Sequence, residues 1–408
     1  MLKSESKTIQ LRMYPAINGD SFLLKANWPE PVNILIDGGY ASTFKKYIYP
    51  DLNILASQGH CLDLVVATHI DSDHVGGLIE FFKQNGNSKD PQIIQVKNVL
   101  HNSIRSLNSA TADKLRNDDL ELLNEISLQG YSASAEPVSD QEEISASQGS
   151  SLAALLLGGG FKWNGANGST SIDCYNTPFI QLKEKVHLQL ISPQPQRLTE
   201  LKSWWMRELR RLGFIGNLGE SAVFDDAFEF LCSQNNSQSS DTESLNQISA
   251  STSCSLSKIY SPDKSVTNSS SIAFIAHVGS AKVLFLGDAW SEDIELQIKK
   301  LKTENKPLIF DAIKVSHHGS LHNTSVSLLE LIDSSAFFIS SNGSLHNHPD
   351  LAVLKEIVDR PSEFKRNLYF SHSTLASKKM SNYKSKSGSE FVIHESANNW
   401  IELTTELL

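Results

Sequence analysis

The sequence has little cysteine and no long apolar run. Its four cysteines lie far apart without a Cys-x-x-Cys pair, so we expect neither a disulfide framework nor a thiolate zinc site, and this usage is typical of a reducing compartment. No segment reaches the roughly 18 consecutive apolar residues that a membrane helix needs. The first 20 residues also lack the apolar core of a signal peptide. We therefore expect a soluble, cytoplasmic protein without a membrane partner.

Basic residues are outnumbered by acidic ones. The chain has 36 Lys and Arg against 46 Asp and Glu, which gives a formal net charge of −10. A general binder of duplex DNA needs a basic face, so this class is not favoured. A hydrophobic content of 40% and a charged content of 20% are typical of globular proteins.

The composition changes locally in two places. Residues 233–257 contain ten serines, and such a segment cannot bury enough apolar surface to offset the entropy of ordering it. Residues 132–150 are likewise rich in Ser, Ala, Gln and Glu. We predict a single domain over residues 1–408 with insertions at about 130–165 and 215–262.

A cluster of imidazoles and carboxylates follows a short apolar run. Residues 62–68 read LDLVVAT, which predicts a buried strand, and the next six residues are His69, Ile70, Asp71, Ser72, Asp73 and His74. A helix is expected to begin around residue 75. Two carboxylates packed this closely should raise each other's pKa unless a cation is present, so the pattern predicts a metal site.

Further apolar runs end in metal-binding residue types. Residues 281–286 lead to Asp288, residues 312–315 lead to His317 and His318, and residues 336–340 lead towards His348. Sites in layered α/β proteins tend to lie at the carboxyl ends of strands. Imidazole and carboxylate without thiolate favour Zn, Mn or Fe, and more than four candidate ligands favour two divalent ions. We expect Zn or Mn.

Several of these segments resemble the motifs of one superfamily. Thr68–Gly77 is similar to the first signature of the metallo-β-lactamase fold superfamily, closest to the branch typified by the soluble domain of ComEC competence proteins, in which Asp replaces the second His. Further matches are LIDGG at 35–39, the N-x-x-S strand from Asn268 to Ser271, LFLGD at 284–288, KVSHHGS at 314–320 and His-Pro at 348–349.

The resemblance implies a four-layer αββα sandwich and hydrolysis by a metal-bridging hydroxide. It implies the following roles: His69 and Asp71 bind one metal, Asp73 and His74 bind the other, Asp288 bridges them, and His348 completes the second site. His317 or His318 would be a ligand or would protonate the leaving oxygen, which makes these two residues and Asp73 the expected catalytic residues. Asp37, Asn268, Ser271 and Lys314 would lie behind the ligands and orient them.

The sequence departs from the superfamily pattern at one position. A histidine usually stands about twenty residues before the bridging aspartate, and here the residue is Asn268. One metal site is therefore expected to be weaker than the other. His101 is a possible substitute ligand.

These motifs favour a phosphodiesterase or nuclease, acting on nucleic acid or on a small nucleotide. A second hypothesis keeps the metal and changes the bond to a lactone, an amide or a thioester, because one fold hosts many reactions. A third is a metal-stabilised interaction module whose Ser-rich insertions contact a protein partner.

Overall fold

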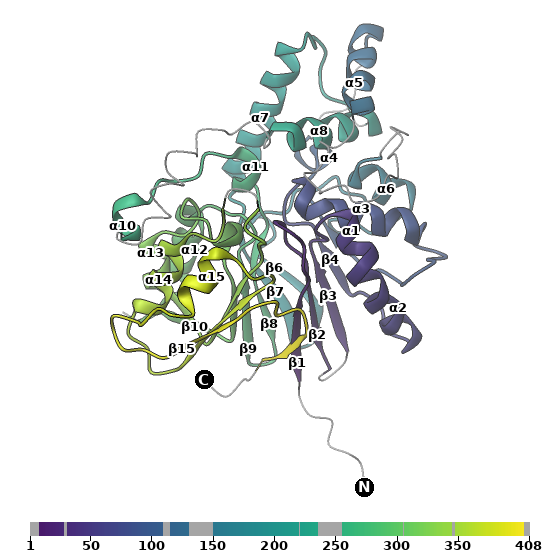
Figure 1. Cartoon of the computed structure of the whole chain (residues 1–408). Helices are drawn as coiled ribbons and strands as arrows, with labels where there is room; N and C mark the ends of the chain where they lie inside the picture. Colours follow the sequence, from purple (N-terminus) through teal and green to yellow (C-terminus); the bar gives the residue numbers. More distant parts are fainter. Residues whose placement is uncertain are drawn as a thin grey trace.

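Two β-sheets pack face to face, and helices cover the outer face of each, in a computed structural model of the chain (Figure 1). The structure describes residues 8–27, 31–108, 115–129, 150–219, 221–235, 255–304, 306–344 and 347–403. The predicted αββα sandwich is therefore confirmed. The Ser-rich stretches at 130–149 and 236–254 lie outside the described residues.

The first sheet has six strands in the order β16-β1-β2-β3-β4-β5. Its strands are β1 (Ile9–Met13), β2 (Phe22–Ala26), β3 (Val32–Ile36), β4 (Leu64–Val66), β5 (Val99–Leu100) and β16 (Trp400–Glu402). β3, β4 and β5 run parallel to one another. Their carboxyl ends therefore meet at one edge of the sandwich.

The second sheet has eight strands in the order β15-β14-β13-β11-β9-β8-β7-β6. They are β6 (Phe179–Lys183), β7 (Val186–Ser192), β8 (Ala273–Val278), β9 (Ala281–Phe285), β11 (Ala312–Lys314), β13 (Ala336–Ile339), β14 (Arg366–Phe370) and β15 (Phe391–His394). β10 (Leu308–Phe310) pairs with β12 (Ile332–Ser334) beside it. β9, β11 and β13 are parallel, so the residues that follow them also share an edge.

The main core fills the space between the sheets. Phe22 of the first sheet meets Phe285 and Phe338 of the second, with ring centroids 5.9 and 6.4 Å apart and edge-to-face geometry. Such pairs add about 0.5–1.5 kcal/mol beyond the burial of their area. This contact lies on the inner faces of both sheets, which fixes how their edges align.

Helices form the two outer layers. The first sheet is covered by α1 (Ala41–Thr43), η1 (Phe44–Ile48), α2 (Tyr49–Ser57), α3 (Ser72–Asn85) and α6 (Leu152–Gly158). The second is covered by α10 (Leu256–Ile259), α12 (Ser291–Leu301), α13 (Val326–Leu331), α14 (Leu351–Asp359) and α15 (Leu375–Met380). α3 begins at Ser72, three residues earlier than predicted, so Asp73 and His74 lie in its first turn.

A group of helices stands above the edge where the motifs meet (Figure 1). We call it the cap: α4 (Ile104–Leu107), α5 (Asn117–Gln129), α7 (Pro195–Arg211) and α8 (Ala222–Asn235). Its apolar core contains Ile70, from the middle of the first motif, beside Trp205 and Phe228. α8 lies within the insertion expected at 215–262. The cap is thus packed directly onto the first motif.

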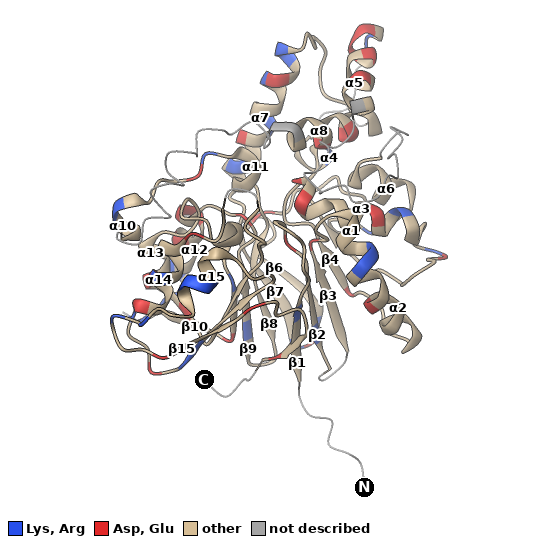
Figure 2. Ribbon diagram, viewed as in Figure 1, with Lys and Arg blue, Asp and Glu red and all other residues tan. Residues whose placement is uncertain are grey.

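The outer surface of the cap carries charged side chains together with exposed apolar ones such as Leu128 and Ile215. Charged side chains on α5 are acidic, whereas those on α7 are of both signs (Figure 2). Within the described residues, no helix has the length and apolar character that crossing a membrane requires.

Candidate metal centre

The first motif places its side chains at the carboxyl end of β4. Both carboxylate oxygens of Asp37 accept hydrogen bonds from Thr68. One accepts from the backbone N–H at 2.8 Å and the other from the hydroxyl at 2.7 Å. The second of these oxygens also accepts from Nδ1 of His74 at 2.9 Å. Asp37 therefore fixes the strand end and orients one imidazole.

Two glycines allow α3 to approach this loop. A Cβ on Gly77 would lie 2.0 Å from the carbonyl oxygen of Gly38, and a Cβ on Gly38 would lie 2.4 Å from the N–H of Leu78. The backbones meet directly instead, with Gly38 N–H donating to the carbonyl of His74 at 2.7 Å. This contact brings His74 to Asp37.

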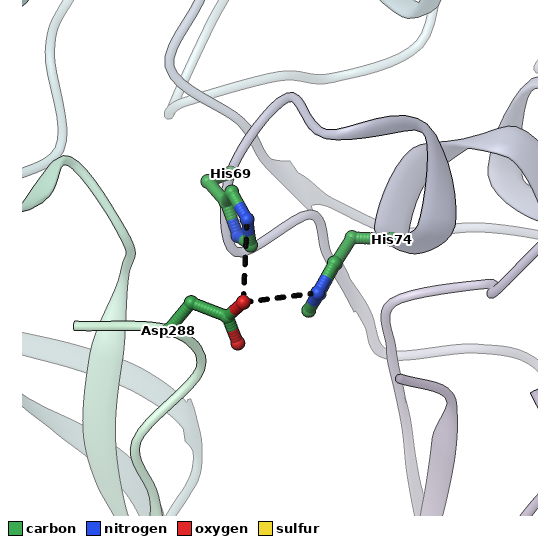
Figure 3. A group of neighbouring side chains, drawn as sticks. All are labelled: His69, His74 and Asp288. Carbon is green, nitrogen blue, oxygen red and sulfur yellow. Dashed lines mark ion pairs between the residues drawn. The ribbon is translucent and has the colours of Figure 1, made fainter. Parts of the chain in front are cut away.

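Four imidazoles surround one oxygen atom. The Nε2 atoms of His74, His318, His69 and His317 lie 3.5, 3.6, 3.8 and 3.8 Å from Oδ2 of Asp288. Figure 3 shows two of them, His69 and His74, directed at that carboxylate from the opposite sheet. The centre thus joins residues more than 200 positions apart in the sequence.

The outer nitrogen of each imidazole faces a hydrogen-bond acceptor. The acceptors are Thr68 Oγ1 for His69 (3.1 Å), Asp37 Oδ2 for His74 (2.9 Å), Asn323 Oδ1 for His317 (2.7 Å) and the Ser340 carbonyl for His318 (2.9 Å). The hydroxyl of Thr68 donates to Asp37, so its oxygen is free to accept. For His74, His317 and His318 in the neutral form, an acceptor at Nδ1 favours a proton on that atom and leaves the Nε2 lone pair directed inward.

An inward-facing set of lone pairs around a carboxylate needs positive charge. The buried Nε2 of His74 makes no hydrogen bond, nor does Oδ1 of Asp288, and a buried polar atom without a partner is costly. Imidazole nitrogen and carboxylate oxygen are the donor set that Zn²⁺ and Mn²⁺ accept. The residues present therefore fit a divalent cation.

The pKa shifts of the buried histidine and aspartate side chains also indicate that this centre favours positive charge. Burial alone would lower the pKa of His74, but Asp288, Asp37 and Asp73 raise it well above its usual range. Burial would raise the pKa of Asp288, yet the neighbouring imidazoles hold it well below its usual range. Burial raises the pKa of Asp73, and Asp71 and Asp288 add to that shift, in the direction that the sequence predicts.

Potential ligand atoms form overlapping groups whose members lie within 4.8 Å of one another. Among the described residues these groups are His69–His74–Asp288, Asp73–His74–His318, Asp288–His317–His318 and Asp20–Asp37–His74. Asp71 adjoins the first group, with Oδ2 3.1 Å from Nε2 of His69. His74, His318 and Asp288 each belong to more than one of these groups.

Other expected residues lie around this centre. Nδ1 of His348 lies 3.4 Å from Asp350, and its ring packs 5.3 Å from that of His317, so the structure places it beside the ligand groups rather than within one. Ser271 accepts the backbone N–H of Asp288 at 3.3 Å. His101 turns Nε2 to Glu229 at 2.8 Å and belongs to none of the groups above.

A buried lysine and a second acid complete the centre. Lys314 forms ion pairs with Asp20 and with Asp288, the latter at 3.6 Å, and donates to the Gly287 carbonyl at 2.9 Å. Burial would raise the pKa of Asp20, but Lys314 and His318 lower it to about 2. Nothing in the local sequence around Asp20 marks it as a site residue. The position of Asp20 next to a buried strand is only a weak indication of a site, because its carboxylate reaches the metal centre only when the chain has folded.

Comparison with known proteins gives a family-model match to part of the chain and a similarity to a solved structure. Residues 18–92 match the family model described as metallo-beta-lactamase superfamily. A search of curated proteins found no match. Among solved structures, a long form of RNase Z from yeast is similar at 11% sequence identity and a TM-score of 0.32. That alignment covers 96% of this chain and 45% of the RNase Z chain, so this chain spans less than half the length of that protein.

The order of the layers and the segment that matches the family model indicate the same fold. The segment at 18–92 contains Asp37 and the whole first motif, and it runs from β2 to the end of α3, which includes three strands of the first sheet. The chain has the metallo-β-lactamase fold.

Proposed function

We propose that this chain is a metal-dependent hydrolase that cleaves a phosphodiester, in nucleic acid or in a small nucleotide. The observation that supports the metal is the convergence of four imidazole Nε2 atoms on Oδ2 of Asp288. All four have their outer nitrogens occupied by acceptors. Burying several acceptor atoms together without a partner is costly, so this arrangement favours a bound cation.

The proposed ligands divide between two cations. His69 with Asp71 would hold one, Asp73 with His74 would hold the other, Asp288 would contact both, and His348 would complete the second set. Two divalent ions, Zn²⁺ or Mn²⁺, would supply a nucleophile from water at neutral pH and positive charge for the leaving oxygen.

The surrounding residues prepare these ligands. Asp37 fixes the tautomer of His74, Ser271 holds the backbone of Asp288, and Lys314 offsets part of the negative charge. His317 and His318 are each proposed as a ligand or as the proton donor to the leaving oxygen.

The choice of a phosphodiester rests on the motifs, since the HxDxDH and HHGS segments resemble the ComEC branch most closely. A net charge of −10 favours a short or single-stranded substrate over long duplex DNA, because the counterion release that drives duplex binding needs a basic face.

A substrate panel tests the reaction class. Protein loaded with Mn²⁺ or Zn²⁺ is expected to hydrolyse bis-p-nitrophenyl phosphate faster than an aryl ester, a lactone or a lactam. Preferential cleavage of the ester, lactone or lactam would instead support the second hypothesis. Metal-loaded protein that is inert on every substrate would contradict the proposal and favour an interaction module.

Replacing Asp288 tests the site within that assay. Asp288→Asn keeps the shape and removes the charge, and we expect kcat/KM for the phosphodiester to fall about 10³-fold, since a metal contributes several kcal/mol and each 1.36 kcal/mol is a factor of ten. Asp311→Asn is the matched control. Asp311 is a buried acid that accepts the backbone N–H of Lys282 at the opposite end of β11. Equal activity in the two variants would refute the role of Asp288.

A further inference from the structure

The orientation of His317 is set by the amide of Asn323. Oδ1 of Asn323 lies 2.7 Å from Nδ1 of His317, while its Nδ2 donates to Asp263 at 2.9 Å and to the carbonyl of Asp288 at 3.0 Å. Both partners of Nδ2 are acceptors, so the amide cannot be reversed. The Nδ1 atom also lies 3.5 Å from Nδ2 of Asn268, but the acceptor on Asn323 is much closer, which favours a proton on Nδ1.

Asp263 holds that amide from behind. Its Oδ2 accepts from the amides of both Asn323, at 2.9 Å, and Asn268, at 2.8 Å, and its Oδ1 accepts the N–H of Ser265 at 2.9 Å. The backbone N–H of Asp263 donates to the carbonyl of His322 at 3.1 Å. The carboxylate is thus fixed by the backbone on one side and fixes two amides on the other.

The turn that carries His317 has an unfavourable backbone. His317 has φ 44° and ψ 54°, and His318 has φ 56° and ψ 19°. Two successive non-glycine residues in the left-handed region are costly, and such strain persists where the surrounding structure enforces it. Here it directs both Nε2 atoms at the same oxygen of Asp288.

We infer that His317 is a metal ligand through Nε2, and that Asp263, acting through Asn323, is a positioning residue that holds His317 in the Nδ1–H tautomer. This inference rests on the metal centre of the proposed function and separates the two roles left open for His317. A proton donor must carry its proton on Nε2, the atom that the network leaves deprotonated in the neutral imidazole.

Cobalt binding tests the assignment without relying on turnover. In Asp263→Asn the new amide cannot accept from both neighbouring amides and from Ser265, so only the Asp288 carbonyl still opposes reversal of Asn323, and the reversed amide places its NH₂ against His317. The proton then moves to Nε2 and blocks the ligand atom. We expect the affinity for Co²⁺, measured against a chromophoric chelator, to fall 10–100-fold, the usual effect of losing such an outer partner. The visible Co²⁺ absorption should change as well.

Two further variants keep the test decisive. His317→Gln should lower Co²⁺ affinity by itself, and adding Asp263→Asn to it should cause no further loss, because Asp263 acts through the imidazole. Asp311→Asn, remote from the centre, should bind Co²⁺ with the wild-type affinity and spectrum.

Different results overturn different claims. Wild-type affinity and spectrum in Asp263→Asn, or additive losses in the double variant, would overturn the positioning role. Unchanged Co²⁺ binding by His317→Gln would overturn the ligand. If wild-type protein binds Co²⁺ yet cleaves no phosphodiester, the proposed function fails while these comparisons still decide the inference. Absence of Co²⁺ binding by wild-type protein would overturn both.

Discussion

Single residues determine the charge balance of the metal centre. Lys314 is buried between Asp20 and Asp288, so it neutralises part of the negative charge that the carboxylates bring together. Burial would lower the pKa of Lys314, but the two acids raise it. The buried ammonium group of Lys314 also reduces the negative charge that a bound metal ion must neutralise.

Replacing Lys314 by Met is expected to lower the free energy of unfolding of metal-free protein by about 3–5 kcal/mol, because removing one partner leaves buried carboxylates uncompensated. Lys299→Met is the control, since Lys299 is exposed and pairs with Glu295 on one helix; it should change stability by less than about 0.5 kcal/mol. Urea unfolding measures both. Equal stabilities of the two variants would show that Lys314 is not needed for charge balance.

His277 predicts a pH dependence away from the centre. It stacks on His187 at 4.4 Å between ring centroids, and burial, followed by the positive charges of His187 and Lys282, lowers its pKa to about 4 from 6.5. The folded state therefore binds fewer protons than the unfolded state between these values. Stability from this group is complete above pH 6.5 and is lost as the pH falls towards 4.

The His277→Gln variant checks this sign. Its free energy of unfolding should fall less steeply than that of the wild type between pH 6.5 and pH 4, as measured by urea titrations across that range. Parallel pH profiles of the two proteins would show that His277 contributes nothing to the slope.

At the scale of elements, the contact between α3 and the loop after β3 positions the first motif. Gly77→Ala would place a Cβ 2.0 Å from the carbonyl oxygen of Gly38, so the backbone must shift, whereas in Gly76→Ala the nearest atom, the carbonyl oxygen of Gly39, is 3.3 Å away. We expect Gly77→Ala to lose about 1–3 kcal/mol of stability and to weaken metal binding.

Gly76→Ala is the control one position earlier in the same helix. It should be close to neutral, because the gain of up to about 1 kcal/mol in helix propensity offsets a tight but tolerable contact. Thermal unfolding and metal titration compare the two. A Gly77→Ala protein as stable as Gly76→Ala would contradict the requirement for close approach.

The elements that carry local patterns were predictable from the sequence. The apolar run at residues 62–68 followed by His and Asp residues located β4 and the first motif, since burial and polarity change sharply there. The start of α3 was placed too late because Asp73 and His74 are polar, although both lie in its first turn. The spacing of apolar residues does not reveal a helical turn whose side chains are polar candidate ligands.

Three residues reach the centre or its ligands through tertiary contacts without belonging to any of the sequence motifs. Asp20 lies in a turn, and Asp263 and Asn323 act on His317 from segments 54 and 6 residues away. None carries a local signal, since isolated Asp and Asn are ordinary in loops. The role of Ile70 in the cap was equally hidden, because its partners in α7 and α8 lie more than 120 residues later.

At the scale of the whole molecule, the two halves of the sandwich each supply part of the centre. His69 and His74 come from the segment that follows β4 of the first sheet, and Asp288, His317 and His318 come from segments that follow β9 and β11 of the second. A cation bound by both would link the sheets, so metal binding should stabilise the folded chain.

Metal at 100 times its Kd should add about 2.7 kcal/mol per site to stability. For a chain of this length, an unfolding entropy of about 2.1 cal/mol/K per residue converts this to a rise in Tm of about 3 °C. Calorimetry of chelator-treated protein with and without Zn²⁺ measures the shift. Asp288→Asn should show a much smaller one, and an equal shift in that variant would place the metal elsewhere.

The most direct measurement is anomalous diffraction at the Zn or Mn edge from crystals of the metal-loaded protein. We predict anomalous density between the imidazoles of His69, His74, His317 and His318 and the carboxylate of Asp288, within coordination distance of their inward atoms. Saturating metal with no density at that position, or with density only elsewhere on the molecule, would contradict it.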